Sequence, residues 1–186
     1  MPVMPVQGSR LSYADLERMP DDGKRYELYD GEAVVVPAPV PRHQLAALDI
    51  MRALDAYATG HGGVVLISPI DIVFTDHDVL QPDIVFFTAA RAHVIDLDRA
   101  IRDAPDLAVE VLSKSTAARD RGRKKEMFAR FGVPEYWIVD PLAKTIEVYT
   151  LTGNTYQLAQ RAEGSDRLRS LVLAGLELPV ADTFRE

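Results

Sequence analysis

The sequence predicts a mixed α/β (α+β) domain with an N-terminal hairpin and extra C-terminal strands. The first observation is the stretch from Asp106 to Asp140, where a strand, a basic helix and a second strand follow one another. The second is a long helical pattern that begins at Pro41. The third is a series of short apolar runs separated by turn residues, which is typical of a sheet.

Composition limits the class of protein. The chain has 186 residues, of which 47% are hydrophobic, so we expect one domain over residues 1–186 with a core of its own. There is no cysteine, which excludes disulfides and thiolate metal sites. The start, Met1-Pro2-Val3-Met4-Pro5, lacks the pattern of a signal peptide, and no apolar run is long enough to span a membrane. We therefore expect a cytoplasmic protein with no membrane partner.

The charge is acidic overall and uneven along the chain. A net charge of −7 argues against indiscriminate binding to nucleic acid, because contacts to phosphates need a positive surface. Between Lys114 and Arg130, however, basic residues outnumber acidic ones. This stretch is either a local positive patch or the solvated face of a helix, and charge alone does not separate the two.

Two helices are expected before the middle of the chain. Ser12 to Asp15 resembles a capping box that opens a short helix ending before Pro20. Pro41 is placed to begin a long helix that runs to about Thr59 and is stopped by a glycine. His43 lies in the first turn of this helix, where a histidine is more often a polar end residue than a ligand.

A hairpin is expected between these helices. Asp30-Gly31 separates two strand-like runs, residues 25–29 and 32–36, which is a strong local hairpin pattern. Glu27 alternates with its apolar neighbours and so projects from the opposite face of the hairpin. An acid at this place is either part of a solvated face or a functional group.

Further strands follow. We expect strands at residues 64–68 and 71–74, then a polar turn at residues 75–78. Asp83 comes directly after a proline and opens the apolar strand 83–87 at the mouth of the sheet. Taken alone, an Asp there is often only a strand terminator. Residues 88 to about 102 form a polar connection with some helical character.

The central strand contains an acid. In Leu107–Leu112 apolar residues occupy odd and even positions alike, which predicts a strand covered on both faces. Glu110 lies inside this strand. Burying a carboxylate is costly unless a cation, a metal or hydrogen-bond donors meet it. A helix is expected to begin at Ser115 or Thr116 and to end near Gly132.

One lysine of that helix is drawn towards the core. Lys124 shares a helical face with Phe128 and Phe131, whereas Lys125 is rotated by about 100° and lies nearer solvent. Lys124 either pairs with the buried acid of the preceding strand or lays its stem on the core with its amine in water. The helix alone leaves both alternatives open.

The C-terminal part is expected to be strand-rich. Residues 135–140, 145–149 and 155–158 read as strands, the last two joined by a Thr-Gly-Asn turn. Residues 167–173 look like an additional strand that wraps back on the core.

Asp83 and Glu110 form the candidate site. The segment between them is long enough to cross back, so both acids can converge at one edge of the sheet. Two carboxylates bind a hard cation such as Mg²⁺. A metal lowers the pKa of a bound water and offsets the charge of a pentavalent phosphate. The lysine would orient that water or stabilise the developing charge.

Five motifs, taken together in order and spacing, resemble the Uma-type putative restriction endonucleases of the PD-(D/E)XK nuclease superfamily. The likeness runs from about Leu11 to Phe184. The motifs are Tyr26-Glu27-Leu28-Tyr29-Asp30-Gly31, Gln81-Pro82-Asp83, Val109-Glu110-Val111-Leu112-Ser113, the Asp120, Lys124 and Phe128 set, and residues 132–141.

The resemblance implies a restriction-endonuclease-like αβββαβ core, in which helices flank a mixed central sheet, and it assigns the catalytic residues. Asp83 and Glu110 match the aspartate and glutamate of the superfamily, which bind the metal. Leu112 stands where a lysine would follow, and the resembling family supplies its lysine from the next helix, at Lys124. Lys114 is the alternative candidate for the catalytic lysine, since in an extended strand its side chain would point to the same face as that of Glu110.

Three further residues are placed near the pocket by the resemblance. Glu27 matches an acid of the family's hairpin and would be a metal ligand or a group that supports one. Gln81 and His43 would line the same pocket. Phe128 stands where the family usually has tyrosine, so a hydroxyl contact would be missing.

The function implied is that of an Mg²⁺-dependent (or Mn²⁺-dependent) endonuclease that hydrolyses DNA. Because nucleases of this fold often pair to cut two strands, we expect a homodimer, with the C-terminal strands as a possible contact. The alternative is a catalytically silent nuclease-like module that binds nucleic acid or a protein partner. The acidic net charge and Leu112 leave room for it.

Overall fold

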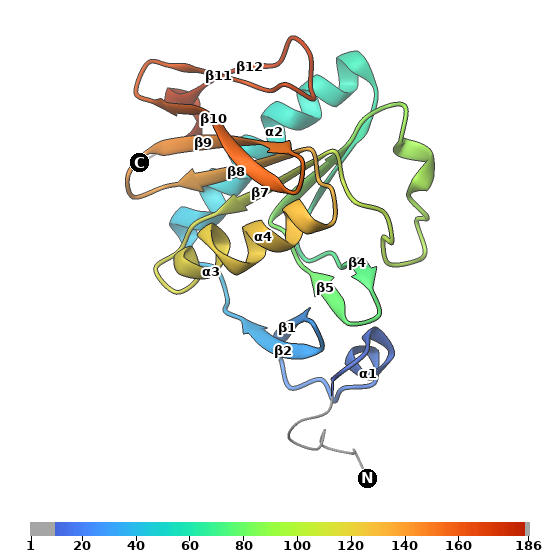
Figure 1. The fold of residues 1–186 in the computed structure, drawn as a ribbon. Coiled ribbons are helices and arrows are strands. Elements are labelled where there is room, and N and C mark those ends of the chain that lie inside the picture. The colour runs from blue at the N-terminus through green and yellow to red at the C-terminus, as the bar shows by residue number, and fades with distance from the viewer. Residues whose placement is uncertain (1–9, 185–186) are drawn as a thin grey trace.

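A computed structural model describes residues 10–184, so the segment that contains Met1-Pro2-Val3-Met4-Pro5 lies outside the described residues. A six-stranded sheet has α2 on one face and α3 and α4 on the other, and a smaller sheet lies below it (Figure 1). In chain order the elements are α1 (Tyr13–Glu17), β1 (Arg25–Tyr29), β2 (Glu32–Val36), α2 (Pro41–His61), β3 (Val64–Ile67), β4 (Ile72–Thr75), β5 (Asp78–Leu80), β6 (Ile84–Phe87), the 3₁₀ helix η1 (Ala92–Val94), β7 (Leu107–Val111), α3 (Ala117–Arg121), α4 (Arg123–Arg130), β8 (Glu135–Asp140), β9 (Thr145–Thr152), β10 (Thr155–Glu163), β11 (Arg167–Arg169), β12 (Glu177–Pro179) and the 3₁₀ helix η2 (Val180–Thr183).

The large sheet confirms the predicted αβββαβ arrangement. Its strand order is β10-β9-β8-β7-β6-β3, in which β7 and β8 run parallel and the other neighbours are antiparallel. Taken in chain order, α2, β3, β6, β7, the α3–α4 pair and β8 give the predicted succession. The insert β4–β5 leaves this sheet and joins the hairpin in a four-stranded sheet of order β2-β1-β5-β4.

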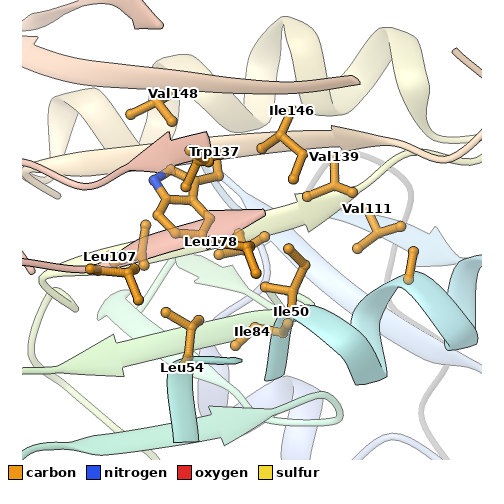
Figure 2. Packing of buried hydrophobic residues seen from close by; sticks show 14 of the residues in the cluster. Ile50, Leu54, Ile84, Leu107, Val111, Trp137, Val139, Ile146, Val148 and Leu178 are labelled. Carbon is orange, nitrogen blue, oxygen red and sulfur yellow. The ribbon is translucent and has the colours of Figure 1, made fainter. Parts of the chain in front are cut away.

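The core on the α2 side is mainly aliphatic, with Phe86 and Trp137 as its buried aromatic residues. Ile50 and Leu54 of α2 face Ile84, Leu107 and Trp137 of the sheet, and all five side chains are buried (Figure 2). Burial of side chains of this kind contributes about 1.5–3 kcal/mol each. The packing therefore fixes α2, and with it the position of the first turn that carries His43.

The core on the α4 side is more aromatic. Met127 and Phe128 of α4 pack with Tyr136 and Ile138 of β8. Strand β7 lies between the two cores and is buried along its whole length, as the apolar residues at both parities predicted. Glu110 lies within this strand, in surroundings with little water.

The N-terminal helix and hairpin are confirmed. Ser12 and Asp15 form the predicted capping box of α1. In the hairpin, Tyr29 pairs with Glu32, and the turn between them holds Gly31 at φ 82°. A Cβ at Gly31 would lie 2.7 Å from Cβ of Arg10, so both the dihedral and the close approach favour glycine here.

The interpretation of the Glu27 face as solvated is wrong. Leu28 pairs with Val79, which brings β5 beside β1 and places the hairpin within a larger sheet. Glu27 and Leu28 are both 0% exposed, so both faces of β1 are covered. The expected alternation is present, but neither side faces water.

Two helix boundaries differ from the expected ones. Helix α2 continues past Gly60 to His61 and is capped by Gly62, which has φ 78°. The helix expected from Ser115 or Thr116 to Gly132 is two helices, α3 and α4, because Gly122 adopts φ −112° and ψ −105° between them.

Several strands also differ in length from the expected ones. Residues 78–80, of which the first was assigned to a turn, form β5. Strands β9 and β10 extend beyond the expected ends, and residues 167–173 hold the short strand β11, which pairs with β12. The connection after β6 contains η1, in keeping with its expected helical character. Among the described residues, no helix has the length and hydropathy needed to cross a membrane.

Candidate active site

The pairing of β6 with β7 brings the two predicted acids together. These strands are antiparallel with Ile84 opposite Val109, so Asp83, which precedes β6, lies beside Glu110. Oδ2 of Asp83 accepts a hydrogen bond of 2.8 Å from the backbone N–H of Val111. Strand register therefore fixes both carboxylates at the same end of the sheet.

Lys124 joins this pair from the first turn of α4. Its Nζ lies 2.7 Å from Oε1 of Glu110 and 2.8 Å from Oε1 of Glu27, and it donates to the carbonyl oxygen of Gln81 at 3.0 Å. The side chain is 3% exposed, so the alternative in which its amine reaches water is wrong. Three elements distant in the chain thus meet at one ammonium group.

The surroundings keep Lys124 charged. Burial disfavours the ammonium, but the carboxylates of Glu110 and Glu27 outweigh it and hold the pKa of Lys124 well above its ordinary value. Lys124 is therefore a permanent cation and hydrogen-bond donor rather than a base.

Glu27 lies behind the lysine, with both carboxylate oxygens engaged. Oε1 accepts from the backbone N–H of Gln81 at 2.9 Å, and Oε2 accepts from the hydroxyl of Tyr29 at 2.8 Å. Burial raises the pKa of Glu27, but Lys124 and Arg119 outweigh it, so the pKa is lower than usual. Glu27 is an ionised anchor for the ammonium of Lys124.

The cost of burying the carboxylate of Glu110 is offset less completely than that of Glu27. Burial raises its pKa well above the ordinary value; Lys124 opposes this shift, and the carboxylate of Asp83 adds to it. Oε1 of Glu110 makes the ion-pair contact with Lys124 but has no partner in hydrogen-bond geometry among the described residues. This oxygen is open to a further electropositive group.

His43 and Gln81 lie at the same place. Nε2 of His43 is 3.1 Å from Oδ2 of Asp83, while its Nδ1 is buried without a hydrogen-bond partner in residues 10–184. The side-chain amide of Gln81 donates to Asp71 at 2.7 Å. All six residues singled out in the sequence therefore lie within one connected cluster.

A cavity of about 30 Å³ opens beside the cluster. This volume holds one or two waters or a bare cation, and it is too small for a nucleotide. Its polar lining consists of Arg25, His43, Ser68, Gln81, Asp83, Glu110, Ser113, Thr116, Arg119, Asp120 and Lys124. Glu27 is not part of the lining.

Comparison with known proteins identifies the family and the fold of the chain. The family model of Uma2, described as putative restriction endonuclease, matches residues 13–181. The chain belongs to the Uma2 family. Among curated proteins, none matches the sequence.

A solved structure shares the fold of this Uma2 chain. It is the crystal structure of a putative nuclease belonging to DUF820 from Anabaena variabilis ATCC 29413, with a TM-score of 0.75 and 18% sequence identity. The match covers 94% of this chain and 97% of that one. At this identity the likeness shows the fold: the chain has the fold of a nuclease-like protein.

Asp120 is a member of the site that the sequence analysis named within a motif but to which it gave no role. It is 2% exposed, lines the cavity, and its Oδ1 has no hydrogen-bond partner among the described residues. Burial raises its pKa, and Lys124 opposes the shift. Its position one turn before Lys124, on the same helical face, was the available indication.

Three arginines of α3 and α4 lie close to carboxylates of the fold. Arg121 lies 2.5 Å from Glu147, and Arg123 lies 2.6 Å from Glu32. Arg119 approaches Glu27 at 3.7 Å. The positive charges of Arg119, Arg121 and Arg123 are therefore compensated by nearby carboxylates of the same chain.

The carboxylate oxygens around the cavity are of the chemical type that a hard divalent cation prefers. Three acidic side chains line the cavity (Asp83, Glu110 and Asp120), and Glu110 and Asp120 each leave a buried carboxylate oxygen without a hydrogen bond among the described residues. Within residues 10–184, no three His, Asp or Glu side chains are already spaced to hold an ion. The fit therefore rests on the oxygen atoms of these carboxylates and not on an excess of negative charge, since Arg25, Arg119 and Lys124 also line the cavity.

Proposed function

We propose that this Uma2-family protein is a metal-dependent endonuclease that hydrolyses phosphodiester bonds in DNA. The observation that supports the proposal best is the meeting of Asp83, Glu110 and Lys124 beside one small cavity, with Nζ of Lys124 2.7 Å from Glu110. Two acids and a permanent cation are the groups that phosphodiester hydrolysis requires.

Asp83 and Glu110 would hold the cation, Mg²⁺ or Mn²⁺, with Asp120 as a further carboxylate. When bound, the cation supplies an acidified water and neutralises charge on the phosphate. Asp83 is suited to this task because Val111 and His43 fix Oδ2. Its carboxylate therefore loses little freedom on binding.

Lys124 would stabilise the negative charge that develops on the phosphate. Its ammonium stays protonated, so it donates hydrogen bonds and does not remove a proton. The contact with Glu110 lies outside hydrogen-bond geometry, whereas the carbonyl of Gln81 accepts from Nζ at 3.0 Å. The contact with Glu110 is therefore the one that would give way to substrate.

Glu27 would position Lys124 rather than bind the metal. Its two oxygens already accept hydrogen bonds from Gln81 and Tyr29, and its side chain does not line the cavity. Of the two roles that the family resemblance allows, support of the site residues fits these contacts better.

The proposal extends to the assembly and location of the protein. Cutting both strands of a duplex needs two such sites, so we propose a homodimer of single-domain chains that acts in the cytoplasm. Sedimentation of the purified protein with and without duplex DNA tests the dimer.

A cleavage assay tests the proposed activity. Plasmid and single-stranded DNA are incubated with the protein in Mg²⁺ or Mn²⁺ and in EDTA, beside Glu110→Gln and the matched control Glu147→Gln. Glu147 lies on β9, pairs with Arg121 and does not line the cavity. We expect the wild type and Glu147→Gln to cut only with metal and Glu110→Gln to be inactive.

The same assay separates the two functional alternatives. Cleavage that survives Glu110→Gln would remove the site assignment. Absence of cleavage under every condition, together with no binding of Mn²⁺ in a calorimetric titration, would favour the catalytically silent module, in which the acids and the lysine only fix the fold.

A further inference from the structure

Three lysine and arginine side chains line the small cavity of the candidate active site, and one of them has no acidic partner. Nζ of Lys124 lies 2.7 Å from Glu110, and Nε of Arg119 lies 3.7 Å from Glu27. Arg25, at the start of β1, forms no ion pair with a carboxylate among the described residues. Its charge is therefore available to an anion that enters the cavity.

The hydrogen-bond partners of Arg25 are neutral. Its Nη1 donates to the hydroxyl of Ser68 at 2.8 Å, and its Nη2 donates to the carbonyl oxygen of Pro37 at 3.5 Å, which is longer than most hydrogen bonds. A guanidinium has five N–H donors, and its bonds to an anion are roughly twice as strong as those to neutral acceptors. Arg25 therefore keeps donors for an anion, and an anion would compete well with the carbonyl of Pro37.

Ser68 connects Arg25 to Asp83. Its backbone N–H donates to the carbonyl oxygen of Asp83 at 2.9 Å, and its hydroxyl accepts from Arg25. Ser68 follows β3 of the large sheet, whereas Arg25 belongs to the small sheet, in which it pairs with Val36. The guanidinium of a hairpin residue is thus held at the end of the large sheet where Asp83 and Glu110 meet.

A second cavity, of about 230 Å³, adjoins the small one and lies between α1 and the start of β1. Arg25 and Gln81 line both cavities and so form the boundary between them. The larger cavity offers a strand the room that the small one lacks. Lys24 also lines it but pairs with Asp22 at 3.1 Å. The acidic side chains on its walls are Glu17, Asp21 and Asp71. Because these acids disfavour an anion elsewhere in the larger cavity, the boundary at Arg25 is the place where a phosphate is favoured.

We propose that Arg25 binds a backbone phosphate of the nucleic-acid strand, at the point where the strand passes from the larger cavity to the smaller one. The inference rests on the proposed function and names a residue that holds the substrate at the same site. The phosphate takes the place of the carbonyl of Pro37, while the hydroxyl of Ser68 keeps the guanidinium in position.

Fluorescence anisotropy of a labelled single-stranded oligonucleotide, in EDTA and again in Ca²⁺, tests binding apart from cleavage. Arg25→Ala is expected to weaken binding roughly tenfold and to lower the slope of log affinity against log salt by about 0.7, the value for one phosphate of a single strand. The matched control is Arg18→Ala, which removes the same charge from a side chain that is 73% exposed and lines neither cavity. It is expected to bind as the wild type does. Equal affinities of wild type and Arg25→Ala, or no binding by the wild type under either condition, would overturn the proposal.

Two further variants distinguish a binding role of Arg25 from a structural one. Ser68→Ala removes the shorter hydrogen bond of Arg25 but keeps the cation, so its affinity is expected to stay close to that of the wild type. A loss as large as that of Arg25→Ala would overturn the proposal, because Arg25 would then act only by fixing Ser68. Arg25→Lys keeps the charge without the planar fork, so it should bind several-fold more weakly with an unchanged salt slope. A salt slope lowered as far as that of Arg25→Ala would contradict a charge contact at this position.

A strand with neutral methylphosphonate linkages identifies the group that Arg25 binds. On this strand the difference in affinity between wild type and Arg25→Ala is expected to disappear, because the partner of the guanidinium has lost its charge. A tenfold difference that persists on the neutral strand would overturn the assignment to a phosphate, since Arg25 would then contact a sugar or a base.

Failure of this inference is separable from failure of the proposed function. Metal-dependent cleavage by the wild type, together with an Arg25→Ala protein that binds like the wild type, would remove the phosphate contact alone. Affinity lost in Arg25→Ala, with no cleavage by the wild type in any metal, would support the contact and remove the nuclease.

Discussion

The ammonium nitrogen of Lys124 lies 2.8 Å from Oε1 of Glu27, although one residue belongs to α4 and the other to the N-terminal hairpin. Glu27 in turn accepts a hydrogen bond from the backbone of Gln81, close to Asp83. Glu27, which does not line the cavity, thus positions the ammonium of Lys124, which does. The stability of the fold and the geometry of the candidate site depend on the same contact.

Removing the ammonium of Lys124 is expected to destabilise the protein strongly. Lys124→Met leaves the buried carboxylates of Glu27 and Glu110 without their common partner, which costs about 3–5 kcal/mol. Lys114→Met removes a lysine that is exposed and is expected to change stability by less than about 0.5 kcal/mol. Urea unfolding monitored by circular dichroism measures both, and equal effects of the two substitutions would contradict the account.

The stability supplied by Glu27 is expected to depend on pH in a stated direction. Its pKa in the folded protein lies below the ordinary value of 4.5, because its cationic partners outweigh burial. A lowered folded-state pKa stabilises the fold above the unfolded pKa, and this contribution is lost as pH falls through the folded pKa. The stability difference between wild type and Glu27→Gln should be constant above about pH 5 and shrink below it. A difference that grows on acidification would show that Glu27 is not held as an anion.

His43 is expected to act through Asp83. His43→Ala should weaken binding of Mn²⁺ by about 10–100-fold, since a residue that orients a ligand typically has an effect of this size. His93→Ala, at an exposed position of η1, is the matched control. Isothermal titration calorimetry gives both affinities. Unchanged affinity in His43→Ala would limit His43 to a packing role.

Packing of α2 against the sheet is expected to contribute heavily to stability. Leu54 is 1% exposed among the residues of the α2-side core, so Leu54→Ala should cost about 2–5 kcal/mol. Leu142, 61% exposed after β8, provides a comparison in which Leu142→Ala should cost less than about 0.5 kcal/mol. Thermal unfolding separates the two cases.

Local patterns were sufficient for the elements nearest the site. The Asp30-Gly31 turn predicts its own hairpin, because its left-handed dihedrals depend only on the residues of the turn. The helical face shared by Lys124 and Phe128 places the lysine on the buried side of the helix, because a buried aromatic side chain fixes the orientation of the helix. Whether the amine pairs with Glu110 or reaches water was not decided by this pattern.

Features that depend on long-range pairing were not predictable in this way. The burial of Glu27 follows from the pairing of Leu28 with Val79, which no local pattern of the hairpin encodes. The break at Gly122 was not predictable either, since glycine within a helical pattern is tolerated in some helices and ends others. The hydrogen bond between the backbone N–H of Val111 and Asp83 depends on strand register. From the sequence, convergence of the two acids could be expected only from the length of the segment between them and from the order of the motifs.

The central claim is that Asp83 and Glu110 bind one divalent cation beside Lys124. Diffraction from crystals soaked in Mn²⁺, recorded at the manganese absorption edge, tests it most directly. The account predicts an anomalous peak within bonding distance of both carboxylates. A peak elsewhere, or none at this cavity while Lys124 still bridges Glu27 and Glu110, would contradict it.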